Sequence, residues 1–112
     1  MGKERKIKRC RLVNYLNVID ESTDAAIGIL VDFSTEGLML ESESAIPVEK
    51  IFNLAVEVAS QMFSLEAQSL WCRKDEKNKV FHTGFTIETL PFDTMNAIWS
   101  LEEAACIDKS LD

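Results

Sequence analysis

Hydrophobic and polar residues alternate along two stretches in the middle of the chain. In FNLAVEVA (52–59), every second residue from Leu54 onward is a branched apolar residue. MFSLEAQSLWC (62–72) repeats the pattern, with every second residue from Phe63 to position 67 apolar. A period of two is typical of a strand that buries one face and exposes the other. Both stretches are therefore predicted to be strands.

Four further stretches have the composition of strands, and short turn-rich segments separate several of them. They are rich in β-branched, aromatic and other apolar residues, and they are RLVNYLNVI (11–19), AAIGILVDF (25–33), GLMLES (37–42) and VFHTGFTIETL (80–90). DESTD (20–24) and STEG (34–37) are typical turn sequences, because Asp, Ser and Gly favour turn conformations. The charged RKDEKNK (73–79) is predicted to be a solvated loop.

The pattern changes after Pro91. Asp93 is a plausible N-cap, and Met95, Ile98 and Trp99 follow at helical spacing, which predicts a helix over about 93–106. Six short strands followed by one helix indicate a mainly β domain, a six-stranded antiparallel β-barrel with a C-terminal α-helix, because closing the sheet removes exposed edges. A parallel α/β architecture is not expected, since no helix separates the strands.

Composition fits one small globular domain. The chain has 112 residues, of which 46% are hydrophobic. No apolar run approaches the roughly 18 residues that a membrane span needs, and the basic N-terminus lacks the apolar stretch of a signal peptide. Cys10, Cys72 and Cys106 are odd in number and widely spaced. We therefore expect free thiols in a cytoplasmic protein, with neither a disulfide framework nor a metal site.

Charge divides the chain into a basic arm, residues 1–11, and an acidic body, residues 12–112. The arm carries six of the 12 Lys and Arg residues against Glu4 alone, so its net charge is +5. The body has 6 basic and 18 acidic residues, and its net charge is −12. This asymmetry indicates an arm that binds an anion or that folds back onto the acidic body.

Two short motifs carry candidate chemistry. The arm contains Arg5-x-x-x-Arg9, and the predicted turn between 25–33 and 37–42 contains Asp32-x-Ser34-x-x-Gly37. Each motif alone has an ordinary explanation. Paired arginines are common in a solvated basic tail, and Asp, Ser and Gly are common in β-turns for local conformational reasons.

In this order and spacing the two motifs resemble the signature of the PilZ domain, a bacterial receptor for cyclic di-GMP. GILVDFSTEGLML (28–40) is similar to the Gly-x-x-x-Asp-x-Ser-x-x-Gly stretch of the family, and HTGFTIETL (82–90) is similar to a later strand. Trp71 and the terminal helix also have counterparts, so the likeness extends over about residues 5–106. It implies a PilZ-like split barrel that binds cyclic di-GMP on its outer surface, with the arm wrapping over the ligand.

The resemblance implies that the ligand-binding residues are Arg5, Arg9, Asp32, Ser34 and Gly37. The chemistry fits, because the planar guanidinium fork matches both a phosphate and the O6/N7 edge of guanine, and lysine cannot reproduce that fit. Asp32 is expected to accept hydrogen bonds from guanine N–H groups, and Ser34 to offer its hydroxyl. Gly37 is expected to let the backbone turn tightly where a side chain would crowd the nucleotide.

Some residues depart from the family pattern or are assigned other roles. Glu4 stands where the family often has a further arginine, and Phe85 follows Gly84 directly. Trp71 and Trp99 are expected to pack in the core or between barrel and helix, with a position of Trp71 near the ligand as the alternative. His82 is expected to be structural. No residues are arranged for catalysis, and no cofactor other than the ligand is expected.

Three functions remain open on sequence grounds. The leading one is a cytoplasmic module that binds cyclic di-GMP and transmits its level to an unidentified protein partner. The alternative is a protein-interaction adaptor of the same fold with weak or no nucleotide binding. A small nucleic-acid-binding barrel is disfavoured because a body with net charge −12 repels polyanions outside the arm. An enzyme is the least expected class.

Overall fold

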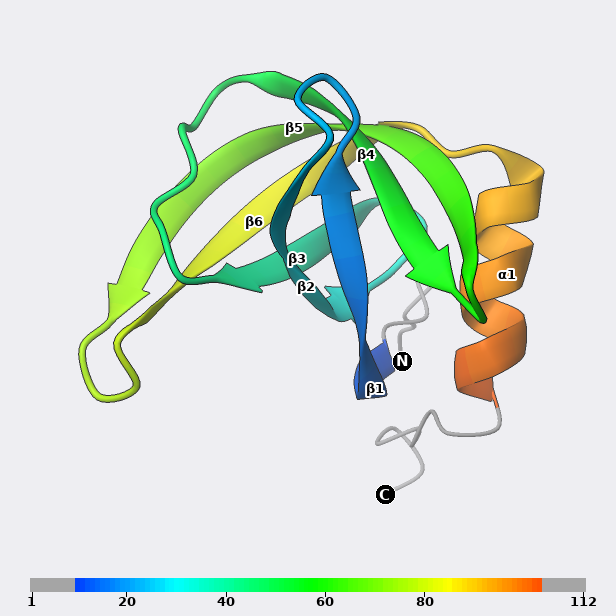
Figure 1. The fold of residues 1–112 in the computed structure, drawn as a ribbon, viewed down its shortest axis with the longest axis horizontal. Coiled ribbons are helices and arrows are strands. Elements are labelled where there is room, and N and C mark those ends of the chain that lie inside the picture. Colours follow the sequence, from blue (N-terminus) through cyan, green and yellow to red (C-terminus); the bar gives the residue numbers. More distant parts are fainter. Residues whose placement is uncertain (1–9, 104–112) are drawn as a thin grey trace, which may run out of the picture.

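The computed structural model describes residues 10–103 of the chain. These residues form a closed barrel of six strands in the order β1-β2-β3-β6-β5-β4, followed by one helix (Figure 1). The elements are β1 (Cys10–Asp20), β2 (Ala25–Phe33), β3 (Gly37–Ser42), β4 (Ile51–Val58), β5 (Gln61–Asp75), β6 (Val80–Thr89) and α1 (Phe92–Glu103). All neighbouring strands are antiparallel, which confirms the predicted fold class.

β1 closes the barrel by pairing with strands on both of its sides. Its register with β2 places Asp20 opposite Ala25, and its register with β4 places the same Asp20 opposite Leu54. The remaining neighbours are hairpins or, for β3 and β6, a pairing of strands far apart in the sequence. Closure gives one enclosed interior and one continuous outer face.

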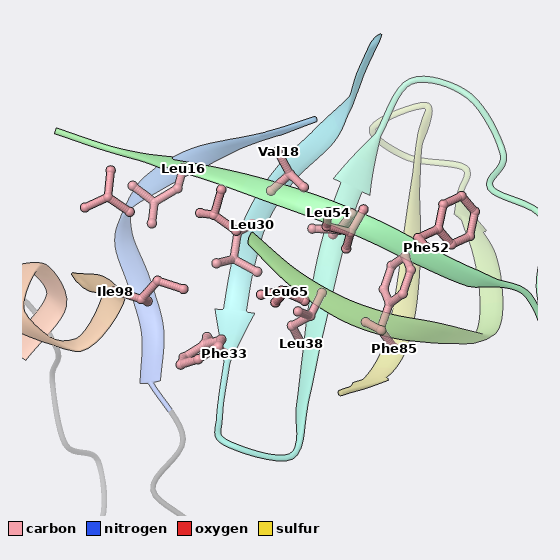
Figure 2. Close-up of a cluster of buried hydrophobic side chains, with 14 of the residues drawn as sticks. Leu16, Val18, Leu30, Phe33, Leu38, Phe52, Leu54, Leu65, Phe85 and Ile98 are labelled. Carbon is pink, nitrogen blue, oxygen red and sulfur yellow. The ribbon is translucent and has the colours of Figure 1, made fainter. Parts of the chain in front are cut away.

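The interior contains the apolar residues that the alternating pattern predicted to share one face. Leu54 and Ala67 are fully buried, and the odd-numbered polar partners of the β4 pattern, such as Asn53, lie outside. Aromatic pairs occupy both ends of this core: Phe52 meets Phe85 with ring centroids 5.9 Å apart, and Phe33 meets Trp99, on α1, at 6.2 Å. Figure 2 shows Phe33 toward the helix, and Phe52 and Phe85 at the opposite side of the cluster.

The helix begins at Phe92, one residue before the predicted start. The prediction that Asp93 is the N-cap was wrong, because the carbonyl of Pro91 already accepts the first helical hydrogen bond from the N–H of Met95, at 3.0 Å. Asp93 therefore lies in the first turn, where its negative charge is favourable to the helix dipole. The predicted end near residue 106 lies outside the described residues.

One face of α1 covers the barrel beside β4 and β5. Ile98 is fully buried, and Thr94, one turn earlier, is 2% exposed. The Thr94 hydroxyl donates a 2.6 Å hydrogen bond to the carbonyl of Ser64 on β5. Trp99 packs between helix and barrel, as the sequence predicted.

The predicted loop at 73–79 is shorter than expected, because its first three residues are strand. β5 continues to Asp75 and β6 begins at Val80, so the connection is reduced to 76–79. The ends of these two strands project beyond the other strands (Figure 1). Residues 71–75 are exposed or partly exposed, so charged residues can remain in strand geometry here. A cation can also lie over an aromatic ring, and the Nζ of Lys74 is 5.9 Å from the centroid of the Phe81 ring.

Candidate ligand-binding face

The turn between β2 and β3 is held by the hydroxyl of Ser34, which is 6% exposed. This hydroxyl donates to the carbonyl of Gly37 at 3.2 Å and accepts from the N–H groups of Glu36, at 3.2 Å, and Gly37, at 3.1 Å. The backbone N–H of Ser34 also donates to the Gly37 carbonyl, at 2.9 Å. A hydroxyl has one donor and two acceptor positions, so the turn uses all three.

Gly37 is required by a close approach between β3 and β6. A Cβ atom at this position would lie 2.8 Å from the carbonyl oxygen of Phe85, a backbone atom that cannot move aside cheaply. The φ angle of Gly37 is not in the left-handed region. The glycine therefore lets two strands come together next to the turn, and its contact is with Phe85 of this chain.

A row of residues runs across the outer face of the barrel. The strand registers pair Arg11 with Asp32, Asp32 with Met39, Met39 with Gly84, and Gly84 with Trp71. We call these five residues the cross-strand row. Their neighbours in β2, β3 and β6, such as Phe33 and Phe85, are buried in the core, and alternation therefore places Asp32, Met39, Gly84 and Trp71 on the outside.

The indole of Trp71 packs directly against the backbone of Gly84. A Cβ atom on Gly84 would be 2.4 to 2.6 Å from three atoms of the Trp71 indole, so the ring occupies the space of the missing side chain. Trp71 remains 38% exposed. The prediction that Trp71 packs in the core or against the helix was wrong, because its position in β5 directs the ring outward over a glycine.

Polar groups surround Trp71 and form a second row beside the first. The Arg73 guanidinium lies 4.6 Å from the centroid of the indole, and His82 meets Glu41 at 3.3 Å between Nε2 and Oε1. A hollow of about 200 Å³ opens among these side chains, lined by Met39, Trp71, Arg73, Lys74, Asp75 and His82. The face thus has a carboxylate, Asp32, toward one end and an aromatic ring with a cation toward the other.

Three of the five predicted site residues are described, and they come together. Asp32 belongs to the cross-strand row, and Ser34 and Gly37 hold the turn directly beside it. Arg5 and Arg9 lie outside the described residues. β1 begins at Cys10, opposite Phe33, so the arm joins the barrel next to Asp32 and the turn.

Sequence reasoning placed Trp71 near the ligand only as an alternative, and it did not name Met39 or Gly84 as site residues. The alignment of these three residues depends on the β3–β6 and β5–β6 registers. One signal was present. A glycine inside a strand, here Gly84 between Thr83 and Phe85, indicates that another group approaches the backbone closely.

Two classes of site are missing from the described part of the chain. Residues 10–103 contain no group of three or more His, Cys, Asp or Glu side chains placed to hold a metal ion. Within the same residues, no helix is long and apolar enough to cross a membrane.

The fold and this face define a small antiparallel barrel with a polar turn and an aromatic platform on one outer surface. The PilZ domain family model matches residues 3–103, and the chain therefore belongs to the PilZ domain family, whose members are binding modules. The structure of the Bacillus subtilis inhibitor of motility (MotI/DgrA) has a similar fold, with a TM-score of 0.69 and 12% sequence identity. The match covers 93% of this chain and 52% of that one, so this chain spans about half its length. No curated protein matches the sequence.

Proposed function

We propose that this PilZ domain binds cyclic di-GMP on the cross-strand row and transmits the level of this second messenger to a protein partner in the bacterial cytoplasm. The observation that carries the proposal is the register that aligns Asp32, Met39, Gly84 and Trp71 on one outer face. Family membership supplies the ligand class, because PilZ domains include receptors for this dinucleotide.

The face offers different contacts for the two chemical parts of the ligand. A guanine base presents N–H donors on one edge, which suit the carboxylate of Asp32, and a flat π-surface, which suits an indole such as Trp71. Base stacking on an aromatic side chain contributes about 1–3 kcal/mol. Because Arg73 covers the indole at 4.6 Å, a base that stacks there displaces the guanidinium, which then becomes available to a phosphate.

The phosphodiesters need cations, and the turn and β3 contribute only negative charge beside the row. Glu36 and Glu41 lie on the turn and on β3, close to the row. Arg5 and Arg9 supply positive charge from the arm, which enters β1 beside the turn. In this proposal Ser34 and Gly37 shape the turn, and the contacts to the nucleotide come from Asp32 and the arginines.

Calorimetric titration of the whole chain with cyclic di-GMP tests the proposal, with GTP and a short RNA as controls. We expect binding of cyclic di-GMP that exceeds both controls, and weaker binding by Asp32→Ala, with a thermal melt of this variant to establish that it is folded. If the parent chain binds no cyclic di-GMP, the sensor hypothesis fails and the adaptor becomes the better assignment. Preference for the RNA would instead favour the nucleic-acid-binding alternative.

A further inference from the structure

The β5–β6 hairpin leaves one strand edge without a partner strand in the described structure. β4 pairs with β5 only from Val58 to Ile51, which stands opposite Gln68. Backbone bonds between Ser69 and residues 49–50 extend this contact by one residue. Among residues 10–103, no strand flanks β5 on this side from Leu70 to Asp75, and Figure 1 shows this end of β5 projecting past β4.

The register determines which backbone groups point to the open edge. Ile87 on β6 donates its N–H to Glu36, on the β3 side, at 2.9 Å. The backbone N–H and C=O groups of successive residues point to opposite sides of a strand. Those of Thr83 and Phe81 therefore also point toward β3 and away from β5. Their partners on β5 are Cys72 and Lys74. These are non-hydrogen-bonded pairs of the antiparallel ladder, in which the backbone N–H and C=O groups of both residues point away from the partner strand.

Cys72 and Lys74 therefore direct their N–H and C=O groups outward. Together they present two donors and two acceptors in strand geometry, which is the pattern that strand addition uses. Their side chains are accessible, since Lys74 is exposed and Cys72 is partly exposed.

Charge around this edge differs from that of the rest of the barrel. Between residues 15 and 100 the basic residues are Lys50, Arg73, Lys74, Lys77 and Lys79, and four of these five lie in the hairpin. These four lie within residues 70–82, the projecting end of the hairpin, where the acidic residues are Asp75 and Glu76. The open edge is thus the positively charged part of an otherwise acidic barrel, and it complements a segment with negative charge.

We propose that the open edge of β5, at Cys72 and Lys74, binds an extended acidic segment of a partner protein as an added strand. A second copy of this chain is a poor occupant. The antiparallel register that pairs Cys72 with Lys74 of another copy places Arg73 directly opposite its own equivalent, and like charges at that position are destabilising. The edge does not depend on nucleotide binding, so this site stands independently of the proposed function.

A displayed library of octapeptides tests the proposal, with Glu or Asp at alternating positions and no cyclic di-GMP present. A matched library carries Lys or Arg at those positions. We expect enrichment of acidic binders only, and slower amide hydrogen exchange at Cys72 and Lys74 when the best acidic peptide is bound. Equal enrichment from both libraries, or protection confined to other strands, would overturn the proposal.

Proline substitution distinguishes backbone pairing from simple charge attraction. Cys72→Pro removes an outward N–H that β6 does not use, so the hairpin is expected to fold. Losing one hydrogen bond should weaken the peptide by about three- to tenfold. Cys72→Ala, which keeps the N–H, is the matched control and should bind like the parent.

A second proline variant protects the test against misfolding. Lys74→Pro is compared with Lys74→Ala, which loses the same charge and keeps the N–H. Equal affinities within each proline and alanine pair would show that no strand is added. Concentration-dependent dimers of the parent in sedimentation that Cys72→Pro abolishes would identify a second copy as the occupant and overturn the assignment to an acidic partner.

Discussion

Two hairpins of this barrel use their polar groups in opposite ways. In the β2–β3 turn the Ser34 hydroxyl is nearly buried, and all of its hydrogen-bonding positions are used by Glu36 and Gly37. In the β5–β6 hairpin the charged side chains of Arg73 and Lys74 lie exposed over aromatic rings. The first hairpin is a fixed support, and the second presents groups that a ligand or partner can use.

This difference distinguishes residues that position the binding face from residues that can contact the ligand. A residue such as Ser34 can be essential to a binding face while its own polar atoms are used within the protein. Trp71 belongs to the contacting kind, since its ring rests on Gly84 and keeps an exposed surface. Substitutions in the turn should therefore reduce stability as well as binding, and substitutions in the hairpin should mainly affect binding.

The largest effect is expected at Arg9, in the arm that joins the barrel beside the β2–β3 turn. A charged hydrogen bond contributes roughly 1.5–3 kcal/mol, so Arg9→Ala should weaken cyclic di-GMP binding by about ten- to a hundredfold. Arg9→Lys should fail almost as badly, because an ammonium lacks the planar fork. Calorimetry measures the affinities, and thermal melts should remain nearly unchanged because Arg9 precedes the first strand.

Lys6→Ala and Lys8→Ala are the controls in the same arm. They should cost much less, and mainly at low salt, where charge attraction is least screened. Arg5→Ala should behave like Arg9→Ala. If Arg9→Ala and Arg5→Ala both bind cyclic di-GMP as the parent does, neither arginine of the arm has a role in recognition.

Gly37→Val should give the largest loss of stability in the turn. Its Cβ would meet the Phe85 carbonyl at 2.8 Å, and forcing extra atoms into packed structure costs about 1–3 kcal/mol. Chemical denaturation measures this change in the free energy of unfolding. Thr35→Val, in the same turn but partly exposed, is the control and should cost less. Equal stability of the two variants would show that the turn is not the fixed support described above.

Trp71→Ala should separate binding from stability in the hairpin. We expect about a fivefold loss of affinity for cyclic di-GMP, near the lower limit for a stacked base, because Arg73 must leave the indole first. The melting temperature should change little, since the ring lies on the surface. Leu70→Ala removes a neighbouring exposed side chain and should leave the affinity unchanged. Unaltered binding by Trp71→Ala would restrict the site to the turn and the arm.

The smallest expected effect is a pH dependence of the turn at the tip of the β5–β6 hairpin. The Asn78 side-chain amide and backbone N–H groups donate to Asp75, and these hydrogen bonds lower the pKa of its carboxyl. A lowered pKa means that the contribution to stability is present above the ordinary carboxyl pKa and is lost as pH falls through the lowered one. The protection of the Lys77 and Asn78 amides against exchange, relative to the intrinsic rate at each pH, should therefore fall at low pH.

Asp75→Asn is the control for this pH dependence, because it cannot ionise. Its turn should show no acid transition in the same exchange measurement. Because Asp75 is partly exposed at the end of the hairpin and its partners lie in the same turn, we expect no measurable shift in the midpoint of global unfolding. An acid transition that persists in the variant would assign the effect to another group.

The sequence predicted the strands well where one face is buried, and less well where neither is. The alternation in 52–59 and 62–72 follows directly from burial against the core. The charged 73–75 segment was assigned to a loop because its strand geometry is stabilised by pairing with β6, which composition does not reveal. The turn at Ala59 and Ser60 has positive φ at both residues, 52° and 69°, without the Asn-Gly sequence that usually marks such a turn.

The site was predictable only where its residues lie close together in the sequence. Asp32, Ser34 and Gly37 form a motif because a single turn brings them together. Trp71 and Gly84 meet through strand register, and a register between distant strands is set by the packing of the whole barrel. The sequence also did not reveal the roles within the motif. The hydroxyl of Ser34 bonds within the turn, and Gly37 packs against the backbone of Phe85.

The contact between Phe33 and Trp99 gives the domain an internal optical reporter. Phe33 stands between Asp32 and Ser34 in the sequence, and its ring meets the indole of Trp99 nearly edge-on, at an interplanar angle of 83°. The indole N–H is buried and has no acceptor among the described residues. The emission wavelength of an indole depends on such surroundings. In a Trp71→Phe background Trp99 is the single tryptophan, so its fluorescence can follow movements of the turn in real time, in a protein that carries no attached dye.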